Sequence, residues 1–479
     1  MTRINSNPAK YAIFFFACIA FHIIGTWSVP LIDRDEPRFA EASREMIERG
    51  DYVVPHFNNQ LRLDKPPLAY WAQVASYKIF GENDFAARFP SAVAAALVAL
   101  SILAWGTQIG GNRVGWWVAI IFTLSLQTFV HAKAAVADMW LVLFVTLAHW
   151  SAFELIENRK SKTENRKWWW LFYISLALGF LAKGPIAWTP LLTIAAFKCF
   201  SRDVKLASRF KFLRGILLTL AIVALWGIPA LIQTHGEFLQ IGIGRHVIGR
   251  SFGAMEGHGS NSLGIYLLLL PFYVVTVFAS FFPWSIKLPA LTKKIWQGRD
   301  VIDIYLICGA AVIFLIFTLI KTKLPHYTLP AFPLLALLVG RHITSARFLK
   351  AATLFAMCFY LAIAFFFAPF AAQFFPAKSL FQQAKQDLRP EMEFGAVEFQ
   401  EPSLVWYFRS RVDGWLTPLN QKSATSFMEK AGPRFVILPT GSVVNAFPNP
   451  PQTWKTFSTS GFNIAKGKHV DLTLVIKER

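Results

Sequence analysis

The sequence predicts an α-helical integral membrane protein with about eleven transmembrane helices. We also expect amphipathic juxtamembrane helices in the first outer loop and a small C-terminal α/β domain. Of the 479 residues, 54% are hydrophobic and only 16% are charged, and the mean hydropathy is +0.42. Soluble domains carry about a quarter charged residues. Many apolar runs also reach the roughly 20 residues that a helix needs to cross a bilayer. These observations exclude a soluble globular enzyme, a disordered chain and a disulfide scaffold.

The net charge of +20 comes from 48 Lys and Arg against 28 Asp and Glu. On a soluble chain this balance would suggest a nucleic-acid partner. Cytoplasmic loops of membrane proteins collect Lys and Arg, however, so we expect no nucleic-acid partner.

The four cysteines lie far apart in apolar runs and form no metal or redox motif.

We assign the membrane spans from the apolar runs. They are expected at 11–32, 86–106, 114–133, 136–155, 168–200 as a hairpin of two short helices, 214–232, 263–286, 301–320, 326–341 and 348–372. The first run lacks a small-residue cleavage site before Asp33, so we expect a retained helix. The hairpin in 168–200 is expected because Gly184 and Pro185 break the run.

Basic loops predict the orientation. With the N-terminus inside, the inner loops hold Lys and Arg clusters within 159–167, 202–214, 293–299 and 341–350. This distribution follows the positive-inside rule. An odd number of spans then puts the C-terminus outside, together with the first outer loop, 33–85.

The tail from about residue 375 changes to a polar composition. Alternating apolar residues at Leu472, Leu474 and Ile476 are typical of a strand. We therefore expect two domains. Residues 1–374 would form the membrane domain, with 33–85 as the loop that carries the chemistry, and residues 375–479 a small outer α/β domain.

Three acids and an arginine follow the first span directly, in the segment 33–36. Charges near hydrocarbon are expensive, which makes them functional candidates. Pro37 suits the first turn of a helix. Apolar residues then recur at three- and four-residue spacing over 37–49, which predicts an amphipathic helix lying on the membrane. The alternative is that the charges only cap and solvate this helix.

A second charged segment of the same loop is Asp64-Lys65-Pro66-Pro67, after which we expect another helix. Lys65 can bind a phosphate as a point charge. The alternative is an ordinary snorkelling lysine at the membrane surface. Tyr70, in the helix that follows, suits the membrane interface.

Two further candidates come from the fourth span and from the loop 233–262. Asp138 is expected at the outer end of the span, where an acid is a functional candidate. The alternatives are a helix cap and an ion pair with Lys133. Arg250 lies in the glycine-rich loop and could clamp a phosphate. His246, in the same loop, and Asp64 are candidate ligands of a divalent metal, although two ligands alone do not establish a site.

The outer end between the ninth and tenth spans contains Lys321, Lys323, His326 and Tyr327. Two lysines on the outer face depart from the positive-inside rule. A bound anion would explain the departure, and interfacial snorkelling is the alternative.

Together these segments resemble the glycosyltransferase-C superfamily of membrane enzymes. The closer resemblance is to its bacterial aminoarabinose-transferase and protein-mannosyltransferase-like branch (glycosyltransferase families 39 and 83). The segments 33–36, 64–67, 181–185 and 321–330 carry it, in the expected order. The resemblance implies a polyprenyl (undecaprenyl) phosphate sugar donor and transfer with inversion. It also implies an active site on the periplasmic face of the bacterial inner membrane, with no cofactor required.

The resemblance also implies roles for residues. Asp33 would be the leading catalytic carboxylate, and Asp138 resembles a second acid lining the site. A carboxylate there can stabilise an oxocarbenium-like transition state and take a proton from an acceptor hydroxyl, although a phosphate acceptor would need no base. Cations would stabilise the charge that develops on the donor phosphate. We assign donor-phosphate binding to Arg34, Lys65, Arg250, Lys321, Lys323 and Tyr327, and acceptor or sugar binding to Glu36 and Tyr70.

One departure concerns the residue before Lys65, which is Asp64 where aminoarabinose transferases usually carry glutamate; the chain is also shorter than is typical. The sugar is therefore open among aminoarabinose, galacturonic acid, mannose and other hexoses. We expect 4-amino-4-deoxy-L-arabinose or a related sugar, with lipid A or lipopolysaccharide as acceptor. The alternatives are a protein O-mannosyltransferase, a non-catalytic assembly factor and a lipid or sugar transporter. A transporter should show internal repeats and charges near mid-membrane.

Overall fold

The computed structural model describes residues 8–157, 162–201, 206–249, 253 and 262–478. Within these residues, five helical segments are long and apolar enough to cross a membrane. They are α4 (Asp84–Gly110), α7 (Asp138–Glu157), Ser208–Gln233 with α11 (Phe212–Gln233), α16 (Val301–Leu319), and Ala346–Ala372 with α18 (Ala346–Ala362). The predicted helical membrane architecture is confirmed, and the count of eleven spans stays a prediction.

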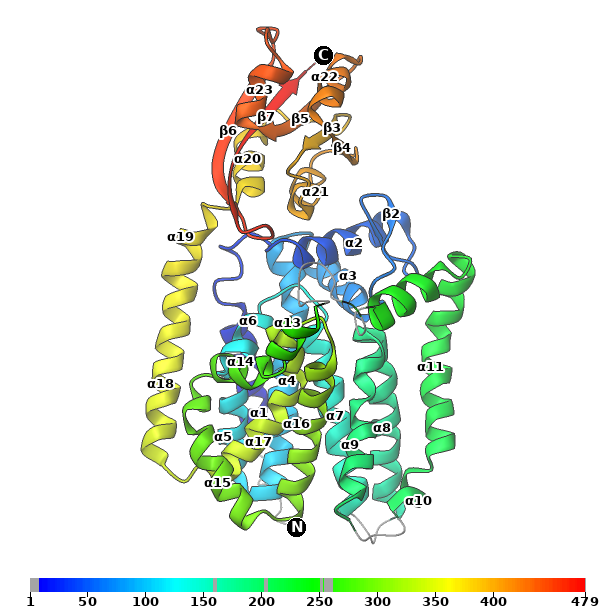
Figure 1. Cartoon of the computed structure of the whole chain (residues 1–479), viewed down its shortest axis with the longest axis vertical. Helices are drawn as coiled ribbons and strands as arrows, with labels where there is room; N and C mark the ends of the chain where they lie inside the picture. The colour runs from blue at the N-terminus through cyan, green and yellow to red at the C-terminus, as the bar shows by residue number, and fades with distance from the viewer. Residues whose placement is uncertain (1–7, 158–161, 202–205, 250–252, 254–261, 479) are drawn as a thin grey trace. The chain divides into compact units, whose positions relative to one another are not determined.

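The chain divides into two compact units (Figure 1). The first contains residues 1–23, 63–72 and 88–361, and the second contains residues 24–62, 73–87 and 362–479. Most of the first outer loop therefore folds with the C-terminal residues, whereas the sequence prediction placed it with the membrane helices. The predicted boundary at 374 and 375 stays a prediction.

The first unit is built from helices. Beside those named above it contains α1 (Pro8–Ile23), α5 (Asn112–Thr123), α6 (Leu126–His131), α8 (Lys162–Lys183), η1 (Pro185–Trp188), α9 (Thr189–Lys198), α10 (Leu206–Phe210), η2 (Leu239–Gly249), α13 (Leu263–Leu268), α14 (Phe272–Ser280), η3 (Trp284–Lys287), α15 (Leu288–Gly298), η4 (Pro325–Ala331) and α17 (Phe332–His342). The helix α3 (Leu68–Phe80) begins in this unit, directly after the two prolines, as predicted.

Proline and glycine break several of the apolar runs. Gly184, at φ +80°, ends α8, and Pro185 begins η1, so the break expected in 168–200 is present. The run 263–286, predicted as one span, is instead divided at Pro271 and Pro283, and the helices on either side of the second break are bent by 119°. A proline lacks the N–H that would continue the helix.

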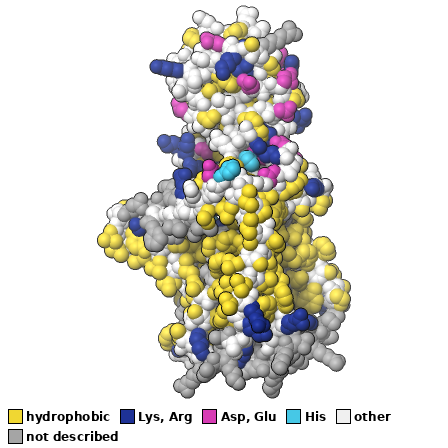
Figure 2. Space-filling model, turned by 90° about the vertical axis from the view of Figure 1, so that its right-hand side faces the viewer, with side chains coloured by type: hydrophobic (Ala, Val, Ile, Leu, Met, Phe, Trp, Pro, Cys, Tyr) yellow, Lys and Arg dark blue, Asp and Glu magenta, His cyan; other side chains and the backbone are white. Residues whose placement is uncertain are grey.

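Apolar packing and an apolar surface both mark the first unit as a membrane structure. Glycine at position 215 lets α11 approach α8 closely, because a Cβ there would lie 1.9 Å from the ring of Tyr173. Large apolar side chains remain exposed along α11, among them Leu213, Leu225 and Ile232. Figure 2 shows such side chains covering much of the helical face turned to the viewer. A face of this kind suits lipid rather than water.

The second unit combines the first outer loop with a small sheet domain. It contains α2 (Asp35–Arg49), β1 (His56–Phe57), β2 (Gln60–Leu61), η5 (Ile363–Phe367), α19 (Ala368–Ala372), α20 (Pro376–Ala384), β3 (Glu393–Val397), α21 (Pro402–Phe408), β4 (Leu416–Leu419), α22 (Gln421–Glu429), β5 (Arg434–Pro439), α23 (Thr440–Ala446), β6 (Lys455–Asn463) and β7 (Lys468–Lys477). The predicted helix 37–49 and the predicted strand at 472–476 are both present.

Five strands form one sheet in the order β4-β3-β5-β7-β6. The strand β3 pairs in parallel with β4 and β5, whereas β7 pairs antiparallel with β5 and β6. Val436 and Leu438 of β5, Val475 of β7 and Phe427 of α22 meet in the core. The C-terminal α/β domain is therefore confirmed as a fold.

Candidate functional site

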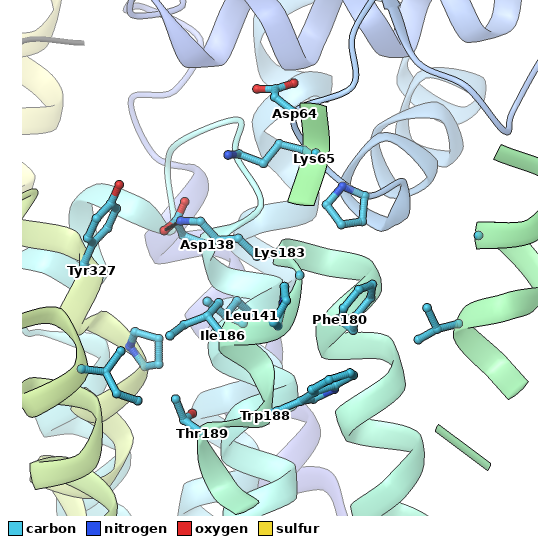
Figure 3. Close-up of a pocket in the computed structure, with 18 of the residues that line it drawn as sticks. Asp64, Lys65, Asp138, Leu141, Phe180, Lys183, Ile186, Trp188, Thr189 and Tyr327 are labelled. Carbon is cyan, nitrogen blue, oxygen red and sulfur yellow. Dashed lines mark hydrogen bonds and ion pairs between the residues drawn. The ribbon is translucent and has the colours of Figure 1, made fainter. Parts of the chain in front are cut away.

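A cavity of about 670 Å³ lies within the first unit. Charged and polar side chains gather at one end, where Figure 3 shows Asp64, Lys65, Asp138, Lys183 and Tyr327. The rest of the wall is mostly apolar and includes Phe180, Trp188, Leu192, Val223, Trp226 and Phe317. This combination can accommodate a ligand with an anionic head and a long apolar tail.

Two neighbouring helices supply the central ion pair of the cavity. Asp138 is the first residue of α7, and Lys183 is the last residue of α8. The Lys183 Nζ donates to Asp138 Oδ1 at 2.5 Å. An acid at a helix N-terminus and a cation at a C-terminus also complement the helix dipoles. Lys133, the partner considered from the sequence, instead donates to the carbonyls of Phe21 and His22, at 3.0 and 2.9 Å.

Histidines extend this cluster. The His326 Nε2 lies 4.0 Å from Asp138 Oδ1, and the His131 ring lies 4.9 Å from that of His326. The ligand atoms of His131, Asp138 and His326 all lie within 4.8 Å of one another, close enough to consider a metal ion. The Lys183 ammonium already occupies Asp138, however, and its charge opposes a divalent cation at the same oxygen.

The other residues predicted in this unit differ in position. Lys65 and Tyr327 line the cavity, with the Lys183 Nζ 5.9 Å from the Tyr327 ring centroid. Lys323 is buried, and its Nζ donates to the carbonyls of Phe317 and Thr318, at 2.9 and 2.5 Å, at the end of α16. Lys321 is partly buried and is not among the residues that line the cavity. Tyr70 is fully buried on α3.

Two predicted residues of the loop 233–262 cannot be placed. Arg250 and the side chain of His246 lie outside the described residues. Asp64 lines the cavity. The metal pair Asp64 and His246 therefore stays a prediction, as does phosphate binding by Arg250.

Asp33 lies in the second unit, where Ser403 holds its carboxylate. The Ser403 N–H donates to Oδ1 at 2.8 Å and the hydroxyl to Oδ2 at 2.6 Å. Burial raises the pKa of the Asp33 carboxyl to about 7; the bonds from Ser403 oppose the rise, and the charge of Glu401 adds to it. A carboxyl with this pKa can exchange a proton near neutral pH.

The neighbours of Asp33 in the sequence also have partners within the second unit. The Arg34 Nε lies 3.9 Å from Glu401 Oε2. Glu36 Oε2 accepts from the backbone N–H of Ile32 at 2.8 Å, so it fastens the chain just before α2. The predicted roles of both residues in substrate binding stay predictions.

Three residues close to Asp138 or Asp33 were not among the site residues predicted from the sequence. Lys183 ends an apolar run before Gly184, which could have indicated a charge at the membrane surface. His326 lies within the segment 321–330, which had been singled out for its charge. Ser403 carries no comparable signal, because 370 positions separate it from Asp33 in the chain.

Comparison with known proteins connects this fold to one superfamily. The family described as dolichyl-phosphate-mannose-protein mannosyltransferase matches residues 64–228. The undecaprenyl phosphate-alpha-4-amino-4-deoxy-L-arabinose arabinosyl transferase of Aeromonas hydrophila is 31% identical over 324 residues, which are 67% of this chain and 57% of the relative. Its namesake from Aeromonas salmonicida is 30% identical over 335 residues, covering 69% and 59%. The chain thus spans less than two thirds of these relatives.

Solved structures extend the likeness over the whole chain. ArnT from Cupriavidus metallidurans, bound to undecaprenyl phosphate, has a TM-score of 0.80 at 18% identity, covering 98% of both chains. The oligosaccharyltransferase AglB from Archaeoglobus fulgidus has a TM-score of 0.52 at 11% identity, covering 91% of this chain and 70% of its own. At these identities the likeness concerns the fold. Together with the sequence relatives, it supports assignment of the chain to the glycosyltransferase-C superfamily, where it is similar to the aminoarabinose transferases.

Proposed function

We propose that the chain transfers a sugar from undecaprenyl phosphate to an envelope acceptor, with inversion, at the periplasmic face of a bacterial inner membrane. The observation that carries the proposal is the cavity, whose wall is mostly apolar and whose one end is charged. An isoprenoid chain suits the apolar wall, and its phosphate suits the lysines. The names of the two Aeromonas relatives and the lipid bound to ArnT support the same donor.

The cations at the charged end would stabilise the leaving group. As the sugar departs, negative charge grows on the donor phosphate, and preorganised cations lower the energy of that state. Lys65 and Lys183 supply ammonium groups there, and Tyr327 a hydroxyl. Asp138 balances and orients Lys183 through the 2.5 Å bond. With these cations available, we propose a reaction that requires no cofactor.

Asp33 is the carboxylate that we propose for catalysis. It would stabilise the positive charge that develops on the sugar and accept a proton from a hydroxyl acceptor. A pKa of about 7 suits a base that works near neutral pH. If the acceptor is a lipid A phosphate, which is already anionic, the same group would orient the acceptor instead.

We propose lipid A or lipopolysaccharide as the acceptor and 4-amino-4-deoxy-L-arabinose or a related sugar as the group transferred. The sugar follows the names of the sequence relatives. The second candidate is a protein O-mannosyltransferase, because the family matched over residues 64–228 carries that description. The two reactions would share the donor chemistry and differ in the acceptor.

The test uses the full chain in nanodiscs with undecaprenyl phosphate aminoarabinose and lipid A, followed by mass spectrometry. We expect sugar loss from the donor and a matching mass gain on lipid A with the wild type. Lys65→Ala and Asp33→Asn should lose most of this turnover. Lys78→Ala, which removes an exposed lysine of α3, is the matched control and should retain it.

Two other results would change the assignment. Transfer of a hexose to a Ser- or Thr-containing peptide, with none to lipid A, would favour the protein O-mannosyltransferase over the lipid A transferase. If neither the aminoarabinose donor nor a polyprenyl-phosphate hexose is consumed, with either acceptor present, the transferase proposal is refuted.

A further inference from the structure

We propose that Ser403, a residue of the C-terminal segment, positions the carboxylate of Asp33 for the reaction. The inference rests on the function proposed above, in which Asp33 acts on the substrates. It assigns to Ser403 a positioning role, since its contacts are with Asp33.

Ser403 fixes both oxygens of the carboxylate. Its backbone N–H reaches Oδ1 at 2.8 Å, and its hydroxyl reaches Oδ2 at 2.6 Å. Two donors from one residue define the plane of the carboxylate as well as its position. Each oxygen retains a further lone pair with which it can meet a substrate.

The backbone around both residues is held, so the pair forms a defined geometry. The Tyr407 hydroxyl, one turn beyond Ser403 on α21, accepts from the N–H of Leu31 at 2.9 Å. The next residue, Ile32, donates its backbone N–H to the Glu36 carboxylate at 2.8 Å. Leu31 is therefore bonded to α21 and Ile32 to the start of α2, and these two residues directly precede Asp33. A catalytic group held in this way loses little freedom when the substrate binds.

Charges on several elements face Asp33. Glu401 precedes α21 and raises the pKa of Asp33, whereas Arg38 on α2 lowers it. Lys378 on α20 lines a small cavity together with Asp33 and Ser403. Among these groups Ser403 is the one that donates to both oxygens of Asp33, and its bonds favour the ionised form.

The experiment compares three variants of the full chain in nanodiscs. Ser403→Ala removes the hydroxyl bond to Asp33, and Ser403→Thr keeps a hydroxyl. Ser410→Ala is the matched control, because Ser410 is an exposed serine just after the same helix. The Ser410 hydroxyl donates to the Tyr407 carbonyl at 2.5 Å. Thermal unfolding verifies that each variant is folded. Turnover gives kcat, KM for the donor and the pH profile, and infrared titration of the carboxyl band that Asp33→Asn removes gives the Asp33 pKa.

We expect Ser403→Ala to lower kcat about tenfold with an unchanged donor KM, as for the loss of one bond to a charged group. The ionised form loses a donor, so the Asp33 pKa should rise by about one unit, and any limb of the pH profile that follows this ionisation should move upward with it. Ser403→Thr should restore both values.

The possible failures are distinct. If the Asp33 pKa is unshifted in Ser403→Ala, or if kcat equals that of Ser410→Ala, the inference is overturned while wild-type turnover still supports the transferase. If the Ser403→Ala chain does not fold, Ser403→Thr decides the question. A lower kcat together with a changed donor KM in Ser403→Thr would also overturn the inference. A wild type that transfers no sugar refutes the proposed function, and this inference with it.

Discussion

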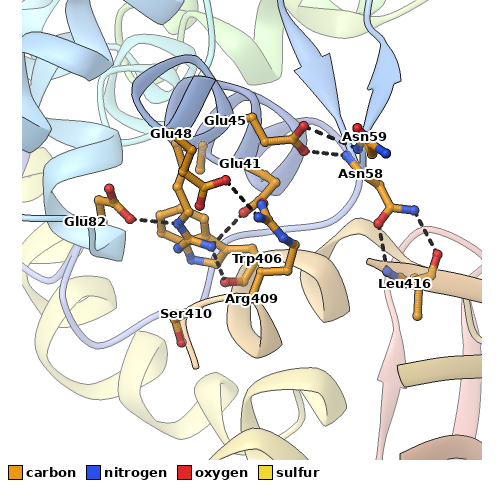
Figure 4. Close-up of polar contacts among 12 residues, drawn as sticks. Glu41, Glu45, Glu48, Asn58, Asn59, Glu82, Trp406, Arg409, Ser410 and Leu416 are labelled. Atoms are coloured by element: carbon orange, nitrogen blue, oxygen red, sulfur yellow. Dashed lines mark hydrogen bonds and ion pairs between the residues drawn. The ribbon is translucent and has the colours of Figure 1, made fainter. Parts of the chain in front are cut away.

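Replacing Arg409 by alanine should release α2 from α21 within the second unit. The Arg409 guanidinium forms ion pairs with Glu41 and, at 2.8 Å, with Glu48 (Figure 4), and it lies 3.7 Å over the ring of Trp415. Glu41 is fully buried, and its other cationic partner is Arg44 at 2.7 Å. The substitution therefore leaves a buried carboxylate with one cation where it had two.

The size of the effect follows from that burial. Removing one partner of a buried ion pair costs about 3–5 kcal/mol, because the remaining charge is left in a poorly polarisable environment. Arg44 stays in place, so we take the lower end, about 3 kcal/mol, which is roughly a hundredfold increase in the equilibrium for local opening.

The effect should depend on pH. Burial raises the pKa of Glu41, whereas Arg44 and Arg409 lower it. Without Arg409 this pKa rises further above its value in the unfolded chain. The folded state then binds a proton that the unfolded state has released, so stability falls as the pH rises through the Glu41 pKa. The defect should be largest in alkaline buffer and should shrink on acidification.

Hydrogen exchange of α2 in the nanodisc-embedded chain measures this opening. Arg411→Ala is the control, because Arg411 is an exposed arginine two positions further along. Adding Glu41→Gln to Arg409→Ala removes the unbalanced charge and should recover part of the protection. Equal exchange in Arg409→Ala and Arg411→Ala, at all pH values, would refute the reasoning.

Three further predictions concern the first unit. Lys183→Met removes the 2.5 Å partner of Asp138 and should lower turnover more than tenfold; wild-type turnover would contradict a role for this pair. Trp226→Ala shortens the apolar wall and should raise KM for the undecaprenyl donor but not for a short-chain analogue, as steady-state kinetics would reveal. Lys323→Met removes two bonds to carbonyls and should lower thermal stability by about 1–2 kcal/mol with an unchanged donor KM; a raised KM would instead favour the predicted phosphate role.

Much of the fold could be predicted because it depends on local composition. Long apolar runs indicate membrane helices whatever their neighbours, and alternation indicated the strand at 472–476. The break at Gly184 was also predictable from local sequence, because Gly184 and Pro185 interrupt an apolar run. The run 263–286 was predicted as a single span because its mean hydropathy is high, although Pro271 and Pro283 divide it. Hydropathy averages do not register the N–H groups that prolines lack.

Only part of the candidate site was predictable, because some of its contacts join residues that lie far apart in the sequence. Lys65, Asp138 and Tyr327 stood out as polar residues beside apolar runs, and all three line the cavity. The partner of Asp138 was not predictable, because Lys133 is near in sequence and Lys183 is 45 positions away. Packing of α7 against α8, rather than spacing, selects Lys183.

The contacts of the C-terminal segment bear on its role, for which the sequence left acceptor binding and capping as alternatives. Within the second unit, four carboxylates from residues 33–84 each receive donors from this segment. Asp33 binds Ser403, Glu41 and Glu48 both bind Arg409, and Asp84 accepts from Lys378 at 2.9 Å and from the Trp406 indole at 2.8 Å. A segment that served only as a cover would need no such set of matched donors. Because one of the four is the carboxylate proposed for catalysis, the contacts favour a segment that holds the first outer loop in a working geometry, whether or not it also binds the acceptor.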